Sequence, residues 1–218
     1  MAKYITIPQS LIENSSLDDK RIIAFVAILY SKWDGSDYEA LVHLSCYYSG
    51  FRGRNGILNQ YKSLVEFYIK NGYLDRGMFN ISREKPFAKI SHSEIKRIFK
   101  LRESLQKEGK RINHAVIFLV LAYIRSHMTN DYYSDFVSRA AQKLNISSRS
   151  FTQALGWLER LEIIHSEQLP RYKTKDGAWH SNVSVFVDME EDGKLVDWKS
   201  KCEQAVKCVR REIFKRKI

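Results

Sequence analysis

The feature that most constrains the fold is the spacing of apolar residues between Phe136 and Ile164. Apolar residues recur there at helical intervals on both sides of a short break at Asn145-Ile146-Ser147. This spacing predicts two helices that share one small core and are joined by a tight turn. Ser147 or Ser148 is placed to cap the second helix. The predicted core consists of Ala140, Leu144, Ile146, Phe151, Leu155, Leu158 and Ile164.

The predicted second helix, 147–161, carries a polar outer face along its first half. Arginine pairs bidentately with guanine and glutamine with adenine, while serine and threonine reach phosphates or base edges. A base-reading helix uses its N-terminal half for such contacts. The predicted DNA contacts on this face, which also includes Gly156, are Ser148, Arg149, Thr152 and Gln153.

Two strands are expected after this helix, at 163–169 and 182–189. The intervening loop contains Asp176-Gly177, a dipeptide typical of tight turns. Aromatic and cationic residues gather in the same loop, so we expect its tip to contact phosphates or a minor groove. The cationic candidates are Arg171, Lys173, Lys175 and His180.

Residues 131 to 190 together resemble the winged helix-turn-helix superfamily. The residues that carry the resemblance are Ala140-Ala141, the turn at 145–147, Leu158-Glu159, Ile163-Ile164 and the loop at 171–180. The resemblance implies a helix placed in a DNA groove and a loop placed on the backbone. Winged helices also serve as protein-interaction modules, so a protein-binding scaffold remains an alternative from another class.

The N-terminal half follows a similar order of elements. Helices are expected at 22–33, at 38–48 and from about 57 to 71, followed by strands at 73–80 and 87–90. Its opening, from Ile5-Thr6-Ile7-Pro8 to Leu17-Asp18-Asp19-Lys20, resembles the start of DNA-binding domains in replication initiators of bacterial plasmids, phages and integrated mobile elements. The glycine-rich stretch 49–56 departs from the expected turn. DNA contacts or solvated loop charges are both open for Arg52, Arg54, Asn55, Asn59 and Lys62.

A connector helix is predicted between the two halves. Ser91-His92-Ser93-Glu94 is a capping-box pattern, and Gly109 is placed to end the helix near Glu108. Its cations Lys96 and Arg97 either follow phosphates or form a solvated face.

The tail, 194–218, reads as a basic amphipathic helix. Its apolar stripe consists of Trp198, Cys202, Ala205, Val209 and Ile213. Arg210 and Arg211 belong either to a phosphate-binding arm or to the solvated side of a helix that binds a second copy or a replication protein.

These elements predict a mainly α fold with small β-hairpin wings, an α+β protein. The expected parts are a divergent winged helix at 1–90, the connector at 91–112, a second winged helix at 113–193 and the tail at 194–218. The helices of the second winged helix are expected at 113–127, 132–144 and 147–161. The net charge of +11 favours a polyanionic partner such as DNA, duplex more than single-stranded. The charge is −2 over residues 113–193 and +6 over the tail, so affinity is expected mostly from outside the second winged helix.

Several function classes find no support in the sequence. Phosphate-loop, zinc-protease and nucleophile-elbow motifs are absent, and the six histidines are scattered, so we expect no enzyme, cofactor or metal site. The longest apolar run, Ala115 to Ile124, is too short to span a bilayer, and the N-terminus opens no signal peptide. We therefore expect a cytoplasmic protein with reduced thiols and no membrane partner. The predicted function is sequence-specific DNA binding in replication initiation, with transcriptional regulation as the alternative.

Overall fold

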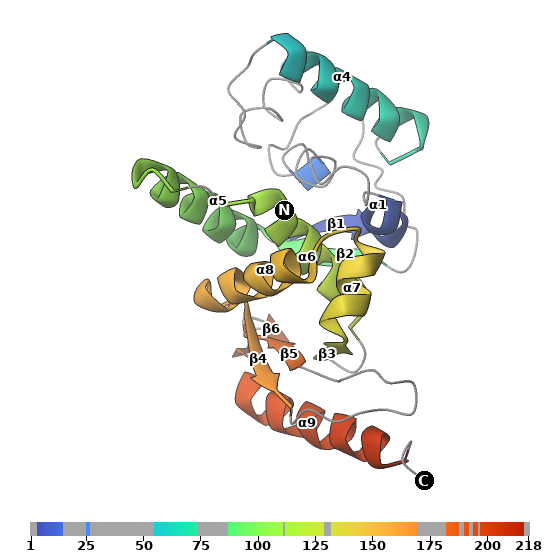
Figure 1. Ribbon diagram of the computed structural model, residues 1–218, viewed down its shortest axis with the longest axis vertical. Helices are drawn as coiled ribbons and strands as arrows, with labels where there is room; N and C mark the ends of the chain where they lie inside the picture. Colours follow the sequence, from blue (N-terminus) through green and yellow to red (C-terminus); the bar gives the residue numbers. More distant parts are fainter. Residues whose placement is uncertain are drawn as a thin grey trace. The chain divides into compact units, whose positions relative to one another are not determined.

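The computed structural model describes residues 4–14, 25–26, 55–73, 87–110, 112–128, 132–169, 182–187, 190–191, 194–195 and 197–215. The fold is mainly helical with small antiparallel sheets, as expected for an α+β protein. The chain forms two compact units, Met1–Ser126 and His127–Ile218. Figure 1 shows the elements of both units in sequence colours.

Unit 1 contains a two-stranded antiparallel sheet. Strand β1, Tyr4–Pro8, pairs with strand β2, Phe87–Ser91, with Tyr4 opposite Ser91 and Pro8 opposite Phe87. The strand predicted at 87–90 is confirmed, but its partner β1 was not predicted as a strand. Helix α1, Gln9–Asn14, follows β1 directly. The strand predicted at 73–80 lies almost entirely outside the described residues.

Helix α4, Asn55–Lys70, confirms the third predicted helix of this half. Tyr68 is fully buried and meets Phe25 edge-on, with ring centroids 5.2 Å apart. The helix ends close to the expected position and is followed by Gly72, whose φ of +70° suits a residue without a side chain. The first two predicted helices lie outside the described residues, except that Phe25 and Val26 are helical and buried.

Helix α5, His92–Lys107, has the predicted capping box. Ser91 Oγ accepts the amide of Glu94 at 3.2 Å, and the Glu94 carboxylate accepts the amide of Ser91 at 2.7 Å. The helix ends before Gly109, whose φ is +71°. Helix α6, His114–Ser126, is buried along its whole apolar run.

The chain divides into its two compact units after Ser126, and the expected boundaries after residues 90, 112 and 193 stay predictions. Helices α5 and α6 both belong to unit 1, where α6 packs on β2, α1 and α5. Because α6 is apolar on nearly every side, its sequence gave no signal of which neighbours it would contact.

Unit 2 is built on a three-stranded antiparallel sheet in the order β3-β5-β4. Along the chain it runs β3 (Tyr132–Asp135), α7 (Val137–Lys143), α8 (Ser148–Arg160), β4 (Ile164–Gln168) and β5 (Asn182–Phe186). Strands β4 and β5 confirm the predicted strand pair. A short ladder, β6 (Glu190–Glu191) with β7 (Lys194–Leu195), follows.

The helix predicted at 132–144 is wrong in its first part, because Tyr132–Asp135 forms strand β3. Tyr132 pairs with Val185 and Asp135 with Asn182, so the strand is stabilised by residues about fifty positions away. The Asp135 carboxylate then accepts the amide of Phe136 at 2.7 Å, just before α7 begins. Aromatic residues such as Tyr132 and Tyr133 also favour strands intrinsically.

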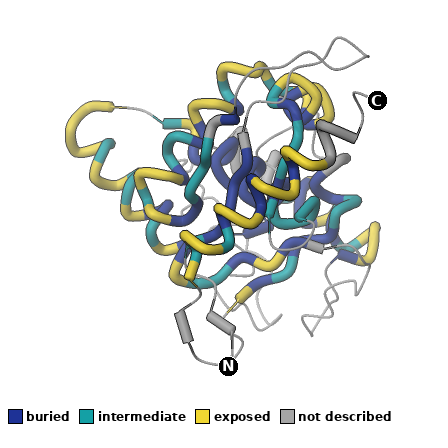
Figure 2. The backbone as a smooth tube through the Cα atoms, turned by 90° about the horizontal axis from the view of Figure 1, so that it is seen from below, coloured by how far each residue is buried: buried dark blue, intermediate teal, exposed yellow. Residues whose placement is uncertain are grey.

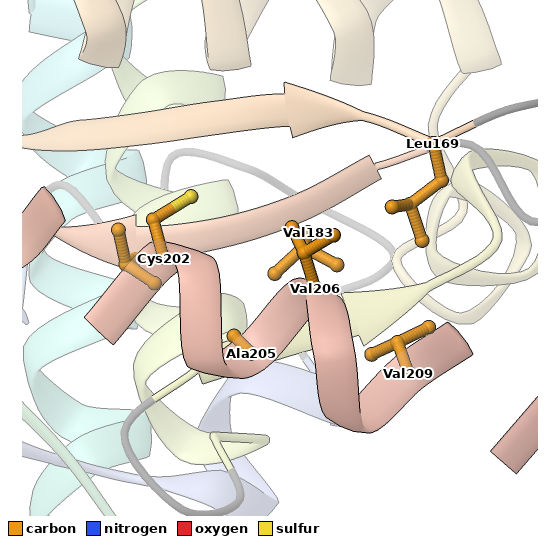
Figure 3. Packing of buried hydrophobic residues seen from close by; sticks show 7 residues of the cluster. Leu169, Val183, Cys202, Ala205, Val206 and Val209 are labelled. Carbon is orange, nitrogen blue, oxygen red and sulfur yellow. The ribbon is translucent and has the colours of Figure 1, made fainter. Parts of the chain in front are cut away.

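Helix α9, Trp198–Lys215, covers one face of the sheet of unit 2. Its residues Cys202, Ala205, Val206 and Val209 pack against Leu169, Val183 and Val185 (Figure 3). The partly buried Tyr132 and Trp198 pack against this cluster. The predicted apolar stripe is confirmed for its described side chains. It is occupied within the chain, so a dimer that used this stripe would first have to displace α9 from its own sheet.

Burial follows the amphipathic pattern of the helices. Figure 2 shows buried and exposed stretches alternating along the backbone. None of the helices in the described part of the chain is long and apolar enough to cross a membrane.

Candidate nucleic-acid interface

The turn between α7 and α8 is fixed by backbone bonds and by a left-handed residue. Asn145 has a φ of +50°, and the amide of Ile146 donates to the carbonyl of Ala141 at 2.9 Å. Asparagine tolerates this conformation better than most residues with a side chain. Ser147 then caps α8, since its Oγ accepts the amide of Ser150 at 3.0 Å. The angle between the two helices is therefore set locally, by the residues predicted to form the turn.

Helix α8 has one buried and one exposed side. Phe151, Ala154, Leu155 and Leu158 are buried. On the other side, all four predicted contacts are exposed, namely Ser148, Arg149, Thr152 and Gln153. The structure thus brings these four side chains together on one surface of one helix.

Thr152 is already engaged within this surface. Its hydroxyl donates to the carbonyl of Ser148 at 2.9 Å, one turn earlier. The proton is used inside the helix, so the hydroxyl oxygen retains only acceptor capacity toward a ligand. Of the four predicted residues, Arg149 and Gln153 remain the side chains suited to bidentate base recognition.

Gly156 is half-buried and follows Thr152 by one turn on the same side of the helix. A methyl group added at Gly156 would meet no atom within 4 Å. Nothing inside the described fold therefore requires a glycine here, although glycine weakens a helix interior by roughly 1 kcal/mol relative to alanine. Its bare backbone permits the close approach of a ligand.

Three further exposed cations stand on α7 and α8 and were not singled out from the sequence. Arg139 and Lys143 stand on the helix before the turn, and Arg139 is exposed with its Nη1 3.9 Å from Asp135 Oδ1. Arg160 is exposed at the end of α8 and stacks over the ring of Trp157 at 4.8 Å. The four-residue spacing of Arg139 and Lys143 was the available signal, since it places both on one side of a helix.

The end of α8 is tied to the sheet. Glu159 Oε1 accepts the amide of Ser166 on β4 at 3.0 Å, and the amide of Ile163 donates to the carbonyl of Leu158 at 3.0 Å. Glu162 takes a φ of +55° between them. These bonds hold the exposed surface of α8 in a fixed orientation relative to the strands.

The predicted cationic loop lies between β4 and β5, whose pairing sets Gln168 opposite Asn182. Its candidates Arg171, Lys173, Lys175 and His180 lie outside the described residues. The strands nonetheless fix where the loop starts and ends on the same sheet that holds α8.

The candidates of unit 1 are only partly described. Arg52 and Arg54 lie outside the described residues, and Asn55 begins α4 without a described side chain. Asn59 is exposed and Lys62 half-buried on the same helix. On α5, Lys96 is exposed and Arg97 half-buried.

The two cysteines of α9 differ in exposure. Cys208 is exposed, whereas Cys202 is buried with its thiol 3.6 Å from Glu167 Oε2. Burial, followed by the hydrogen bond to Glu167, raises the pKa of Cys202 to about 11. The thiol therefore stays protonated at neutral pH and is a poor nucleophile. Cys46 lies outside the described residues.

Within the described part of the chain, no group of three or more histidine, cysteine, aspartate or glutamate side chains is placed to hold a metal ion. Comparison with known proteins found no match among protein-family models, curated protein sequences or solved structures.

Proposed function

We propose that unit 2 carries a winged helix-turn-helix and that the protein is a sequence-specific, non-enzymatic DNA-binding protein. The observation that carries the proposal is the exposed surface of α8, where Arg149 and Gln153 stand beside Ser148 on a capped helix. Arginine and glutamine are side chains that read guanine and adenine edges. Arg149 and Gln153 lie in the N-terminal half of α8, which is the half that recognition helices insert into a major groove.

The order of elements in unit 2 supports this proposal. A short helix, a tight turn, a longer helix and a strand pair with an intervening cationic loop follow one another, as in the pattern that residues 131–190 resemble. Arg139 and Lys143 on the shorter helix add cations where the first helix of such a pair crosses the DNA backbone. In this arrangement phosphate contacts set the register and α8 reads the bases.

The proposed biological role is replication initiation for a plasmid, phage or integrated mobile element. This role rests on the resemblance of the opening residues 5–20, of which residues 5–14 form part of β1 and α1 and the others lie outside the described residues. Transcriptional regulation would use the same DNA-binding surface.

Binding to labelled duplexes of randomised sequence across a salt series tests the proposal. We expect the logarithm of affinity to fall linearly with the logarithm of salt concentration, because each neutralised phosphate releases counterions. We also expect one sequence family to be enriched after repeated selection. Failure to bind duplex or single-stranded DNA at low salt would overturn the proposal and favour a protein-binding scaffold.

A further inference from the structure

We propose that α9 forms a second DNA-binding surface, which holds a different duplex segment from the one read by α8. The inference rests on the proposed function of α8 and extends it from binding one duplex to bridging two. Its basis is the position of the two helices relative to the sheet of unit 2.

The sheet separates α8 from α9. Val183 and Val185 of β5 face α9, where they join its apolar cluster. Alternate residues of a strand point to opposite sides of the sheet, so Ser184 faces away from α9. On that side its hydroxyl shares a hydrogen bond of 2.8 Å with the hydroxyl of Ser166. Helix α8 lies on that other side, and Figure 1 shows the strands between the two helices.

The outward side of α9 is basic. Between residues 199 and 211 five cations stand against one acidic residue, Glu203. Lys199, Lys207, Arg210 and Arg211 are exposed. Among the described residues, Lys207, Arg210 and Arg211 take part in no ion pair, so their charges are available to an external anion.

The apolar stripe of α9 is used to cover the sheet, which makes the helix part of the unit rather than a loose arm. The side chains Cys202, Val206 and Val209 are all buried there. The cations are consequently held at helical spacing on a fixed surface. A repeating row of phosphates is the partner that such a fixed row of cations fits, and the contact would be independent of sequence.

The dimensions of the unit favour two separate duplexes over one straight duplex shared by both surfaces. Two helices of about 10 Å diameter on either side of a sheet have axes roughly 20 Å apart, and their outer sides lie about 30 Å apart. Because the outer sides point away from each other, a duplex that lies against α8 does not reach Arg210 and Arg211 on α9. We therefore place a second segment on that side.

The test uses the full-length protein and two short duplexes with different dyes, each too short to reach both surfaces. Sedimentation gives the number of duplexes bound per protein at low salt, and energy transfer between the dyes reports bridging. The variant is Lys207→Gln/Arg210→Gln/Arg211→Gln. The matched control, Ser200→Ala/Gln204→Ala, alters two uncharged exposed residues of the same helix.

We expect the wild type and the control to bind two duplexes per protein. The triple variant should keep its affinity for the first duplex within about threefold and bind the second at least tenfold more weakly. Two bound duplexes in the triple variant, or only one in the wild type, would refute the bridging inference and leave the proposed function intact. A wild type that binds no DNA would instead refute both.

Discussion

Arg125 Nη2 lies 2.6 Å from Glu94 Oε1, and the two side chains are 13% and 2% exposed. The second carboxylate oxygen of Glu94 accepts the amide of Ser91 at 2.7 Å. One buried carboxylate therefore caps α5 and also neutralises a cation on α6. Since both helices belong to unit 1, this group links two of its helices through charge as well as through packing.

Replacing Arg125 with methionine is expected to destabilise the protein by roughly 3 kcal/mol, because it leaves the buried charge of Glu94 without its partner. Urea unfolding of the wild type and the variant measures the change. The double variant Glu94→Gln/Arg125→Met should recover part of the loss, since no buried charge is stranded. A cost below about 0.5 kcal/mol for Arg125→Met would show that the pair contributes no more than a surface ion pair.

Gly156→Ala is expected to raise stability and lower DNA affinity at the same time. Alanine favours the helix by roughly 1 kcal/mol, and the added methyl group meets nothing inside the described fold. The same group would obstruct a duplex that approaches the backbone of α8. Thermal melting and fluorescence anisotropy measure the two effects, with Gln204→Ala on α9 as a control. Unchanged affinity in Gly156→Ala would mean that DNA does not approach α8 at this point.

Arg149→Ala is expected to relax sequence preference, at a cost of about 1 to 3 kcal/mol for the preferred site. Lys173→Ala/Lys175→Ala should weaken binding to all sequences alike and reduce the salt slope by about two. Competition between the selected duplex and a scrambled one distinguishes the two patterns. If both variants match the wild type, α8 and its adjoining loop do not read DNA.

Alkylation with iodoacetamide near neutral pH should label Cys208 much faster than Cys202. The first thiol is exposed, whereas the second is buried and its pKa is raised to about 11. Peptide mass mapping over time assigns the label to each cysteine. Equal rates for the two residues would show that α9 leaves the sheet on the timescale of labelling.

The contribution of Cys202 to the free energy of unfolding should decrease at alkaline pH. Its folded pKa of about 11 lies above the ordinary value of 9.0, so the contribution is complete below pH 9 and is lost as the pH rises toward 11. The stability difference between the wild type and Cys202→Ala should therefore narrow over this range. Urea unfolding at several pH values measures it, and Cys208→Ala, which alters an exposed thiol, serves as the control.

The parts of the fold that depend on local sequence were predictable. The Ser91 capping box, the Ser147 cap and Gly109, which follows the end of α5, were all identified from residues close to one another. The exposed surface of α8 was predictable for the same reason, since helical periodicity alone separates Arg149 and Gln153 from the buried Phe151 and Leu155.

The parts of the fold that depend on distant partners were not predictable from the sequence. Strand β1 forms because Ile5 and Ile7 pair with β2 more than eighty residues later. Strand β3 depends on β5 in the same way. The covering of the sheet by α9 was missed because an apolar stripe specifies that a helix is buried and leaves its partner undefined.

The covering of the sheet by α9 also determines when, during synthesis, the apolar side of the sheet is shielded from solvent. Leu169, Val183 and Val185 leave the ribosome before Val206 and Val209, which shield them in the finished structure. Until α9 has been translated, a nascent chain presents an apolar sheet surface to chaperones or to other nascent chains. Premature termination ahead of α9 would make that exposure permanent and turn a folded product into an aggregation-prone one.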